Sequence, residues 1–121
     1  MPIAKILVVD DSPTDRQHLS ELLTKSGFQV STAESAEDCF AKVKQSRPDL
    51  VLMDVVMPGQ NGFQATRALA KDESTKNIPV ILCSSKSQET DKVWGLRQGA
   101  KDYVTKPVNP ADLLAKIQAL G

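Results

Sequence analysis

Short apolar segments recur along the chain, and each is followed by polar turn residues. Residues 6–9, 50–53 and 80–83 are uninterrupted hydrophobic runs, a pattern typical of strands buried on both faces of a parallel sheet. Residues 28–33 alternate apolar and polar side chains, which indicates an edge strand with one solvated face. Residues 102–105 form the last predicted strand.

Helical patterns with polar caps separate these segments. Ser12 fits an N-cap position, and Asp15 follows three residues later, as in a capping box with Asp in place of Glu. Glycine or proline marks several of the helix ends. The predicted helices run from Pro13 to the stop at Gly27, from Ala36 to before Pro48, over 63–71, over 90–98, and from Pro110 onward.

Strict alternation of strand and helix predicts an α/β fold of the (βα)5 type. Such a chain forms a parallel sheet with helices on both faces. The one edge-like strand is the second, which favours the flavodoxin-like strand order 2-1-3-4-5. We therefore expect a single domain spanning residues 1–121.

Charge and cysteine content narrow the class of protein. Fifteen basic and fifteen acidic residues cancel, which argues against a broad nucleic-acid-binding face. Cys39 and Cys83 lie inside apolar patterns without C-x-x-C spacing, so we expect buried thiols in a reducing compartment. Residues 1–5 show no signal sequence, and no apolar run approaches a membrane span. We expect a cytoplasmic protein without membrane insertion.

Polar side chains follow four of the predicted strands. Asp10 and Asp11 follow the first strand, Asp54 the third, Ser84 the fourth and Lys106 the fifth. In an open parallel sheet, ligands bind at the carboxyl ends of the strands, and these four strands are neighbours in the predicted order. Asp54 alone fits a loop cap equally well. The full set predicts a shallow pocket.

The charges of this set favour a divalent cation and phosphoryl chemistry. Three carboxylates bring three negative charges, and Lys106 returns one positive charge. Oxygen ligands with room for water suit Mg²⁺, which leaves the site formally neutral. Asp54 would then act as a nucleophile and form an acyl phosphate. Lys106 and the metal would neutralise the transferred group, and Ser84 would donate a hydrogen bond to it.

Competing chemistries match the residues less well. The chain has no G-x-x-x-x-G-K-[ST] motif for a P-loop. Asp10 and Asp11 would repel the phosphate of a flavin nucleotide. A phosphatase with a D-x-D motif needs a second Asp two residues after the first, where this chain has Val56 after Asp54 and Ser12 after Asp10. His18 falls on the outer face of its helix without metal-ligating neighbours, so we interpret it as a surface residue.

Four motifs together resemble a response-regulator receiver domain of the CheY-like family: VVDDS (8–12), LMDVVMPGQNG (52–62), IPVILCSS (78–85) and GAKDYVTKP (99–107). The resemblance covers essentially the whole chain. It implies that Asp54 is the phosphoacceptor, and that Asp11, Asp54 and the Val56 carbonyl bind Mg²⁺ with help from Asp10. It also implies a protein that is not a conventional enzyme but catalyses its own phosphoryl transfer and autodephosphorylation.

The same resemblance assigns a switch. It implies that Ser84 shifts to bond the phosphoryl group, that Tyr103 then turns inward, and that Lys106 contacts the phosphoryl oxygens before a cis bond to Pro107. This would reshape the surface of the fourth helix, fifth strand and fifth helix, where a partner docks. A static Tyr103 within the strand is the alternative.

The resemblance also implies partners. The phosphodonor would be a phosphohistidine on a sensor kinase of the CheA type, and no output domain is expected, as in single-domain, monomeric CheY-like proteins. Residues 62–80 and 87–108 look most like PilH-type receivers of type IV pilus twitching motility, which implies a downstream motility protein. Related receivers serve phototaxis or other chemosensory arrays. A phosphorylation-independent interaction module and a phosphate sink for a shared kinase are the alternatives.

Some positions depart from the best-known single-domain pattern. Val56 and Lys86 stand at the two pocket-rim positions that tune rates in receivers, and neither is acidic or amide-bearing here. Val55 replaces an aromatic residue beside the acceptor. Trp94 falls on the fourth predicted helix, where we expect it to pack in the core rather than contact a partner, and to be quenched weakly by Mg²⁺.

Overall fold

The computed structural model describes residues 3–86 and 88–121. Three residues lie outside this range: Met1, Pro2 and Ser87. The first two belong to the segment that we expected to lack a signal sequence, and Ser87 begins one of the PilH-like segments. The described elements are β1 (Lys5–Val9), α1 (Pro13–Lys25), β2 (Gln29–Ala33), α2 (Ala36–Gln45), β3 (Leu50–Asp54), α3 (Gly62–Lys71), β4 (Val80–Ser84), α4 (Glu89–Arg97), β5 (Asp102–Thr105) and α5 (Pro110–Leu120).

All five predicted strands pair in one parallel sheet, in the order β2-β1-β3-β4-β5. This confirms the predicted fold class and strand order. The predicted helices are also present, with ends that differ by a few residues at most. The edge strand β2 alternates exposed and half-buried positions, whereas every residue of β3 and β4 is buried.

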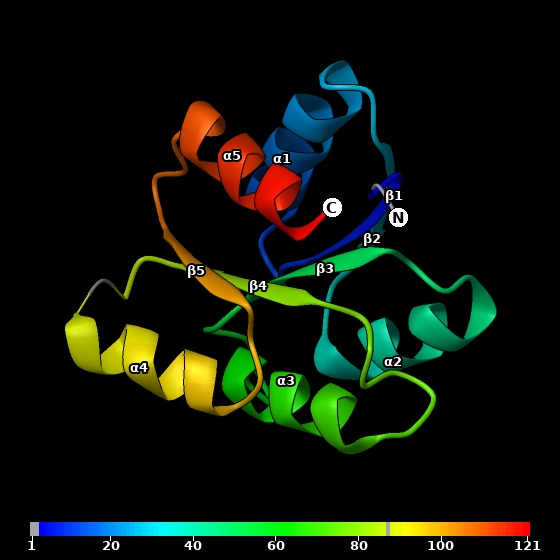
Figure 1. The fold of residues 1–121 in the computed structure, drawn as a ribbon, viewed down its shortest axis with the longest axis vertical. Helices are drawn as coiled ribbons and strands as arrows, with labels where there is room; N and C mark the ends of the chain where they lie inside the picture. Colours follow the sequence, from blue (N-terminus) through cyan, green and yellow to red (C-terminus); the bar gives the residue numbers. More distant parts are fainter. Residues whose placement is uncertain (1–2, 87) are drawn as a thin grey trace.

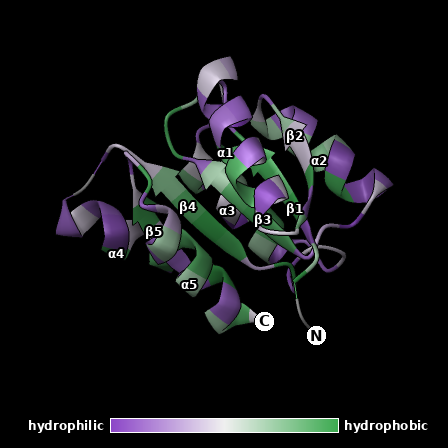
Figure 2. Cartoon of the chain, turned by 90° about the horizontal axis from the view of Figure 1, so that it is seen from above, coloured by the Kyte–Doolittle hydropathy of each residue, from purple (hydrophilic) through white to green (hydrophobic). Residues whose placement is uncertain are grey.

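Helices cover both faces of the sheet, as Figure 1 shows: α1 and α5 lie on one side, and α2, α3 and α4 on the other. Alternate strand residues supply the two cores because successive side chains point to opposite faces. Ile6, Val8 and Leu52 belong to the core with α1 and α5. Leu7 and Met53 belong to the core with α2 and α3. The sheet is thus buried on both faces, as its apolar runs predict, and Figure 2 shows the central strands in the hydrophobic colour.

Local caps explain where the helices begin. Ser12 Oγ accepts a hydrogen bond from Asp15 N at the start of α1, with Pro13 at the first helical position. Asn61 and Gln64 form a complete capping box at the start of α3, which the sequence analysis did not identify. The caps fix the loops that follow β1 and β3, and both loops border the carboxyl edge of the sheet.

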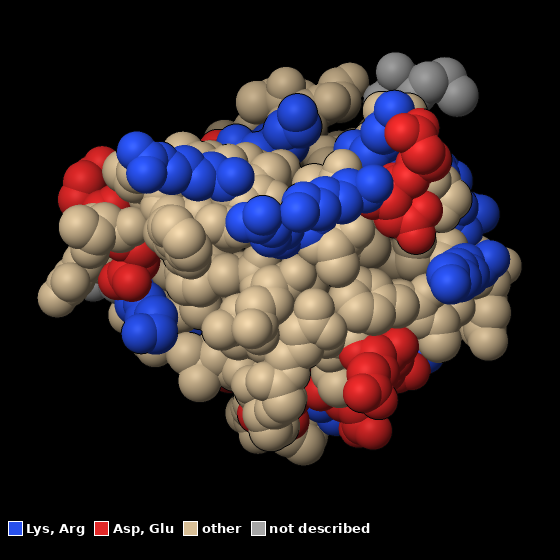
Figure 3. Space-filling model, turned by 90° about the horizontal axis from the view of Figure 1, so that it is seen from below, with Lys and Arg blue, Asp and Glu red and all other residues tan. Residues whose placement is uncertain are grey.

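The surface formed by α2, α3 and α4 carries both signs of charge. Figure 3 shows lysine and arginine side chains on this face together with acidic ones, separated by uncharged surface. This mixture agrees with the cancelling charges of the sequence. Among the described residues, the structure contains no helix whose length and hydropathy would let it cross a bilayer.

Gly62 fixes the path of the chain between β3 and α3. Its backbone N donates to Val55 O at 2.9 Å, and a Cβ at this position would lie 2.1 Å from the Asp54 carbonyl oxygen. Gly59, in the same loop, has a φ of 75° but open space around its Cβ position. Gly62 therefore permits a close backbone approach, while Gly59 permits a left-handed conformation.

These two glycines give a direct test of the loop. We expect Gly62→Ala to lower the free energy of unfolding by about 3 kcal/mol or more, because backbone must move away from the new methyl group. Gly59→Ala should cost only about 1–2 kcal/mol, the usual penalty for a left-handed residue with a Cβ. Urea unfolding measures both, and equal losses in the two variants would contradict this account.

Candidate functional site

Three carboxylates gather at the carboxyl edge of the sheet. Val9 of β1 pairs with Met53 of β3, so the residues that follow them, Asp10 and Asp54, are neighbours at that edge. One carboxylate oxygen from each of Asp10, Asp11 and Asp54 lies within 4.8 Å of the other two. Asp10 and Asp54 are buried and Asp11 is exposed. The parallel register therefore creates the predicted acidic cluster.

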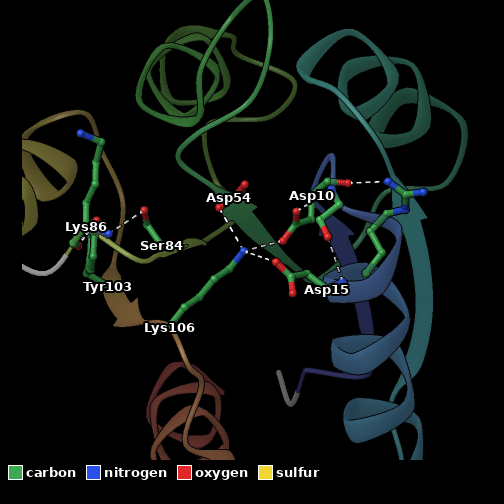
Figure 4. A network of polar contacts seen from close by, with 9 residues as sticks. Asp10, Asp15, Asp54, Ser84, Lys86, Tyr103 and Lys106 are labelled. Carbon is green, nitrogen blue, oxygen red and sulfur yellow. Dashed lines mark hydrogen bonds and ion pairs between the residues drawn. The ribbon is translucent and has the colours of Figure 1, made fainter.

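Lys106 reaches this cluster from the end of β5. Its Nζ lies 2.8 Å from Asp10 Oδ2 and 3.3 Å from Asp54 Oδ1, as Figure 4 shows. The same atom lies 3.0 Å from Asp15 Oδ2. The ammonium group thus bridges β1, β3 and the first turn of α1. The bond from Lys106 to Pro107 is cis, as the resemblance implies.

The loop after β1 orients Asp10 from its main chain. Asp10 N donates to Ala33 O at 3.0 Å, which ties the residue to the end of β2. Asp10 Oδ1 accepts from Ser12 N at 2.9 Å, so its other oxygen, Oδ2, faces Lys106. Arg16 Nη1 donates to Asp10 O at 2.7 Å. These contacts hold the carboxylate in one orientation.

The pKa of Asp54 reflects both its burial and the negative charge beside it. Burial, and then the neighbouring charge of Asp10, raise the pKa of Asp54 to about 6, although Lys106 opposes the shift. Burial alone would lower the pKa of Lys106, but its hydrogen bonds to Asp10 and Asp15 raise it above the ordinary value. Lys106 is therefore firmly charged, and it does not neutralise the acidic cluster.

The acidic cluster fits a magnesium ion. Its donors are carboxylate oxygens, which Mg²⁺ prefers, and the exposed Asp11 leaves the site open to the water molecules that this ion retains. Its three carboxylates outnumber the single ammonium of Lys106, so additional positive charge would be favourable there. Val56 follows Asp54 by two residues at the start of the loop, and its side chain is exposed. Val55, between them, is buried in the core.

Ser84 and Tyr103 form a separate corner beside the acidic cluster. Ser84 Oγ accepts from Lys86 N at 3.1 Å, and Tyr103 Oη donates to Lys86 O at 2.7 Å. Figure 4 shows the Ser84 hydroxyl on the side of Lys86. The sequence predicted that Ser84 would share the pocket with the acidic residues. In this structure its hydroxyl, at the end of β4, accepts a hydrogen bond from the loop that follows this strand.

Tyr103 already lies inward. Its side chain is buried, and its ring packs near Gly95 of α4, where a Cβ would lie 3.3 Å from the tyrosine Cδ2. Burial raises the pKa of this phenol above its ordinary value. We expected the ring to turn inward as part of the switch. In this structure the hydrogen bond to Lys86 O and the small residue on α4 stabilise the inward position.

The expectation that Trp94 packs in the core was wrong. The residue lies on α4, as predicted, but half of its surface is exposed, and Val93 and Leu96 are exposed as well. Among the described residues of this helix, Gly95 is the buried position. The helix therefore rests on the sheet through a glycine, which leaves its large apolar side chains outside the core. The prediction that His18 is a surface residue is confirmed.

The contribution of α1 to this site was not predicted from the sequence. Asp15 was expected only to cap the helix, yet its carboxylate also pairs with Lys106. Arg16 had no predicted role, and it binds the main chain of Asp10. The signal was available in principle, because a first-turn residue that follows Asp10 and Asp11 so closely must lie near the same sheet edge.

Comparison with known proteins agrees with this geometry. The family model described as "Response regulator receiver domain" matches residues 6–118. The chain therefore belongs to the receiver-domain family of response regulators, the modules that act in phosphorelay signalling. The resemblance seen in the sequence is thus confirmed.

Individual members of the family show how similar this chain is to known receivers. The chain is 58% identical to Protein PilH of Pseudomonas aeruginosa over 118 residues, which cover 98% of both chains. Its structure matches chemotaxis protein CheY4 of Vibrio cholerae with a TM-score of 0.91 at 33% identity, covering 98% of this chain and 99% of that one. It also matches a CheX–CheY–BeF3–Mg complex from Borrelia burgdorferi, with a TM-score of 0.89 at 28% identity, covering 97% and 88%.

The raised pKa of Asp54 predicts how stability depends on pH without divalent ions. Between its ordinary pKa of 3.8 and the folded value of about 6, the folded state binds more protons than the unfolded state, so stability falls as pH rises. Asp54→Asn should therefore raise the free energy of unfolding at pH 7 by about 1–2 kcal/mol and have little effect near pH 4.

Asp49 supplies a control of opposite sign. Hydrogen bonds from Lys5 N and Ala4 N lower the pKa of Asp49, so its contribution to stability is lost as pH falls. Asp49→Asn should lower stability at pH 7 relative to the wild type. Urea unfolding in a chelating buffer across this pH range measures both variants. An Asp54→Asn protein no more stable than the wild type at pH 7 would contradict the electrostatic account.

Proposed function

We propose that Asp54 accepts a phosphoryl group from a phosphohistidine of a sensor kinase and that this reaction switches a protein-interaction surface. The observation that carries the proposal is the buried Asp54 carboxylate, 3.3 Å from Lys106 Nζ and within the cluster formed with Asp10 and Asp11. Membership in the receiver-domain family supports the same chemistry.

In the proposed reaction, an Asp54 oxygen forms a bond to phosphorus while the bond from phosphorus to the donor nitrogen breaks. The electron pair of the broken bond remains on the histidine ring. Asp11, Asp54 and the Val56 carbonyl would hold Mg²⁺, and Asp10 would assist. The metal supplies positive charge that lets the anionic donor approach a carboxylate. Lys106 contributes a second positive charge beside the acceptor oxygen.

The chain is then its own catalyst, although it is consumed as the acceptor and is not a conventional enzyme. The residues that position Asp10 and Lys106 provide the preorganised electrostatics that such a transfer needs. Hydrolysis of the acyl phosphate would return the protein to its starting state. Val56 and Lys86, both exposed at the rim, are the positions proposed to set that rate.

We infer that the output surface is formed by α4, β5 and α5. Exposed apolar side chains on α4, namely Val93, Trp94 and Leu96, support this surface as a site for a protein partner. Tyr103 of β5 links it to the loop after β4 through Lys86 O. The identity of 58% with PilH supports a pathway that controls type IV pilus twitching motility, in which a CheA-like kinase is the proposed phosphodonor.

We place this exchange in the cytoplasm. Cys39 and Cys83 are both unpaired and buried, as expected in a reducing compartment. Burial raises the pKa of each thiol to about 12, so neither is a reactive thiolate at neutral pH. Their role is packing, and they do not compete with Asp54 as nucleophiles.

The central test is phosphorylation of the purified protein with acetyl phosphate and Mg²⁺. Intact mass spectrometry should show one added phosphoryl group on the wild type and none on Asp54→Asn. Asp112→Asn is a suitable control, because Asp112 lies on α5 and pairs with Lys116 at 2.8 Å. A wild-type protein that stays unmodified, or a modified Asp54→Asn protein, would refute the proposed role of Asp54.

The rim position offers a second test. Val56→Asn should shorten the lifetime of the acyl phosphate, because an exposed amide beside Asp54 can hold the attacking water. The Val56 side chain is 56% exposed, so this change should leave folding intact. Val93→Asn is a matched control, since Val93 is 43% exposed on α4. Decay of the phosphorylated proteins can be followed by mass spectrometry, and equal decay rates would contradict a rate-tuning role.

A further inference from the structure

Asp15 contacts the site lysine although it stands outside the acidic cluster of Asp10, Asp11 and Asp54. Its Oδ2 accepts a hydrogen bond from Lys106 Nζ at 3.0 Å. The remaining carboxylates around this ammonium are Asp10 at 2.8 Å and Asp54 at 3.3 Å. A lysine ammonium has three N–H donors. Two of them donate to Asp10 and Asp15, and Asp54 forms an ion pair with the same ammonium.

We propose that Asp15 is a positioning residue for phosphoryl transfer, which keeps the Lys106 ammonium beside Asp54 while the other carboxylates are engaged by the reaction. The inference rests on the proposed function of Asp54. Asp15 forms and breaks no covalent bond in the transfer. The new bond joins an Asp54 oxygen to phosphorus, the donor bond breaks, and the proton stays on Lys106.

The need for such a residue follows from the other partners of the lysine. Asp10 and Asp54 belong to the set proposed to hold Mg²⁺, so in the loaded site their oxygens are shared with the cation. Lysine carries its charge on a flexible four-carbon stem, and it loses its orientation when its partners are lost. Of the three carboxylates that pair with Lys106, Asp15 is the one that is not proposed to hold Mg²⁺.

The backbone of α1 holds Asp15 in place. Asp15 N donates to Ser12 Oγ at 3.3 Å in the N-cap of this helix, and Pro13 restricts the first turn. Further along α1, Leu19 and Leu23 are buried against the sheet. Asp15 also lines a groove together with Leu19, Lys106 and the loop after β5. The carboxylate therefore approaches Lys106 from an anchored helix.

A simple stabilising ion pair would not explain this arrangement. The Asp15 side chain is 45% exposed, and ion pairs at exposed positions contribute little to stability because water screens them. The Lys106 side chain is 19% exposed and points toward buried carboxylates. Asp15 therefore acts mainly on where the ammonium points, and its loss should affect the reaction more than the fold.

The test compares Asp15→Asn with Asp15→Glu and Asp112→Asn. Asp112 is a matched control, because it occupies the same position after an N-cap and a proline at the start of α5, and it also pairs with a lysine. At saturating Mg²⁺, Asp15→Asn should be phosphorylated by acetyl phosphate about 10-fold more slowly than the wild type. Asp15→Glu should recover part of the rate, and Asp112→Asn should react at the wild-type rate.

A spectroscopic measurement separates positioning from general damage. In wild-type protein loaded with Mg²⁺ and beryllofluoride, NMR should detect the Lys106 ammonium as a slowly exchanging group. In Asp15→Asn this signal should broaden or disappear, while the backbone spectrum and the urea midpoint stay close to those of Asp112→Asn.

The outcomes distinguish this inference from the function on which it rests. A wild-type protein that takes up no phosphoryl group would overturn the proposed function itself. Normal phosphorylation of the wild type, with Asp15→Asn equally fast or faster, would overturn only the role of Asp15. An unchanged Lys106 signal in Asp15→Asn would do the same.

Discussion

A lysine ammonium surrounded by carboxylates is the interaction on which the carboxyl edge of this sheet depends. The side chains of Asp10 and Asp54 are 2% and 8% exposed, and Lys106 pairs with both. Burying such charges costs several kcal/mol for each ion, and a good partner must offset this cost. Lys106 offsets only part of it, because the acidic groups outnumber it. Burial, and then the neighbouring charge of Asp10, raise the pKa of Asp54 even though Lys106 opposes the shift. The excess of carboxylates over ammonium groups favours the binding of a cation at this edge of the sheet.

The parallel sheet turns this local chemistry into a defined geometry. Pairing of Val9 with Met53 brings the ends of β1 and β3 to the same level, and the main-chain hydrogen bond from Lys106 N to Ser84 O, at 2.8 Å, aligns the end of β5 with that of β4. The side chains of the site therefore inherit their positions from a backbone that is buried on both faces. Gly62 lies so close to the Asp54 carbonyl that no side chain would fit there. This contact fixes the path of the loop that follows Asp54.

The same edge connects the site to the surface of the molecule. Ser84 and Tyr103 both bind the main chain of Lys86, which connects the end of β4 to a residue on β5. Above this corner, α4 rests on the sheet through Gly95 and exposes Trp94. A helix with so little of its surface in the core costs little to displace. Lys86 and Tyr103 thus connect the end of β4 to the helix that carries the exposed apolar side chains.

Much of this architecture is determined by local sequence. The apolar runs at residues 6–9, 50–53 and 80–83 require strands buried on both faces, and the acids that end two of them must then lie at one edge of a parallel sheet. The contact of Asp15 with Lys106, the burial of Tyr103 and the exposure of Trp94 were decided by tertiary structure. Each depends on how a helix sits on the sheet, and a contact such as that from Asp15 to Lys106 joins residues 91 positions apart. Hydrophobic periodicity determines which face of an element is buried. How closely a helix approaches the sheet depends on small residues such as Gly95, and their effect appears only when the two elements pack together.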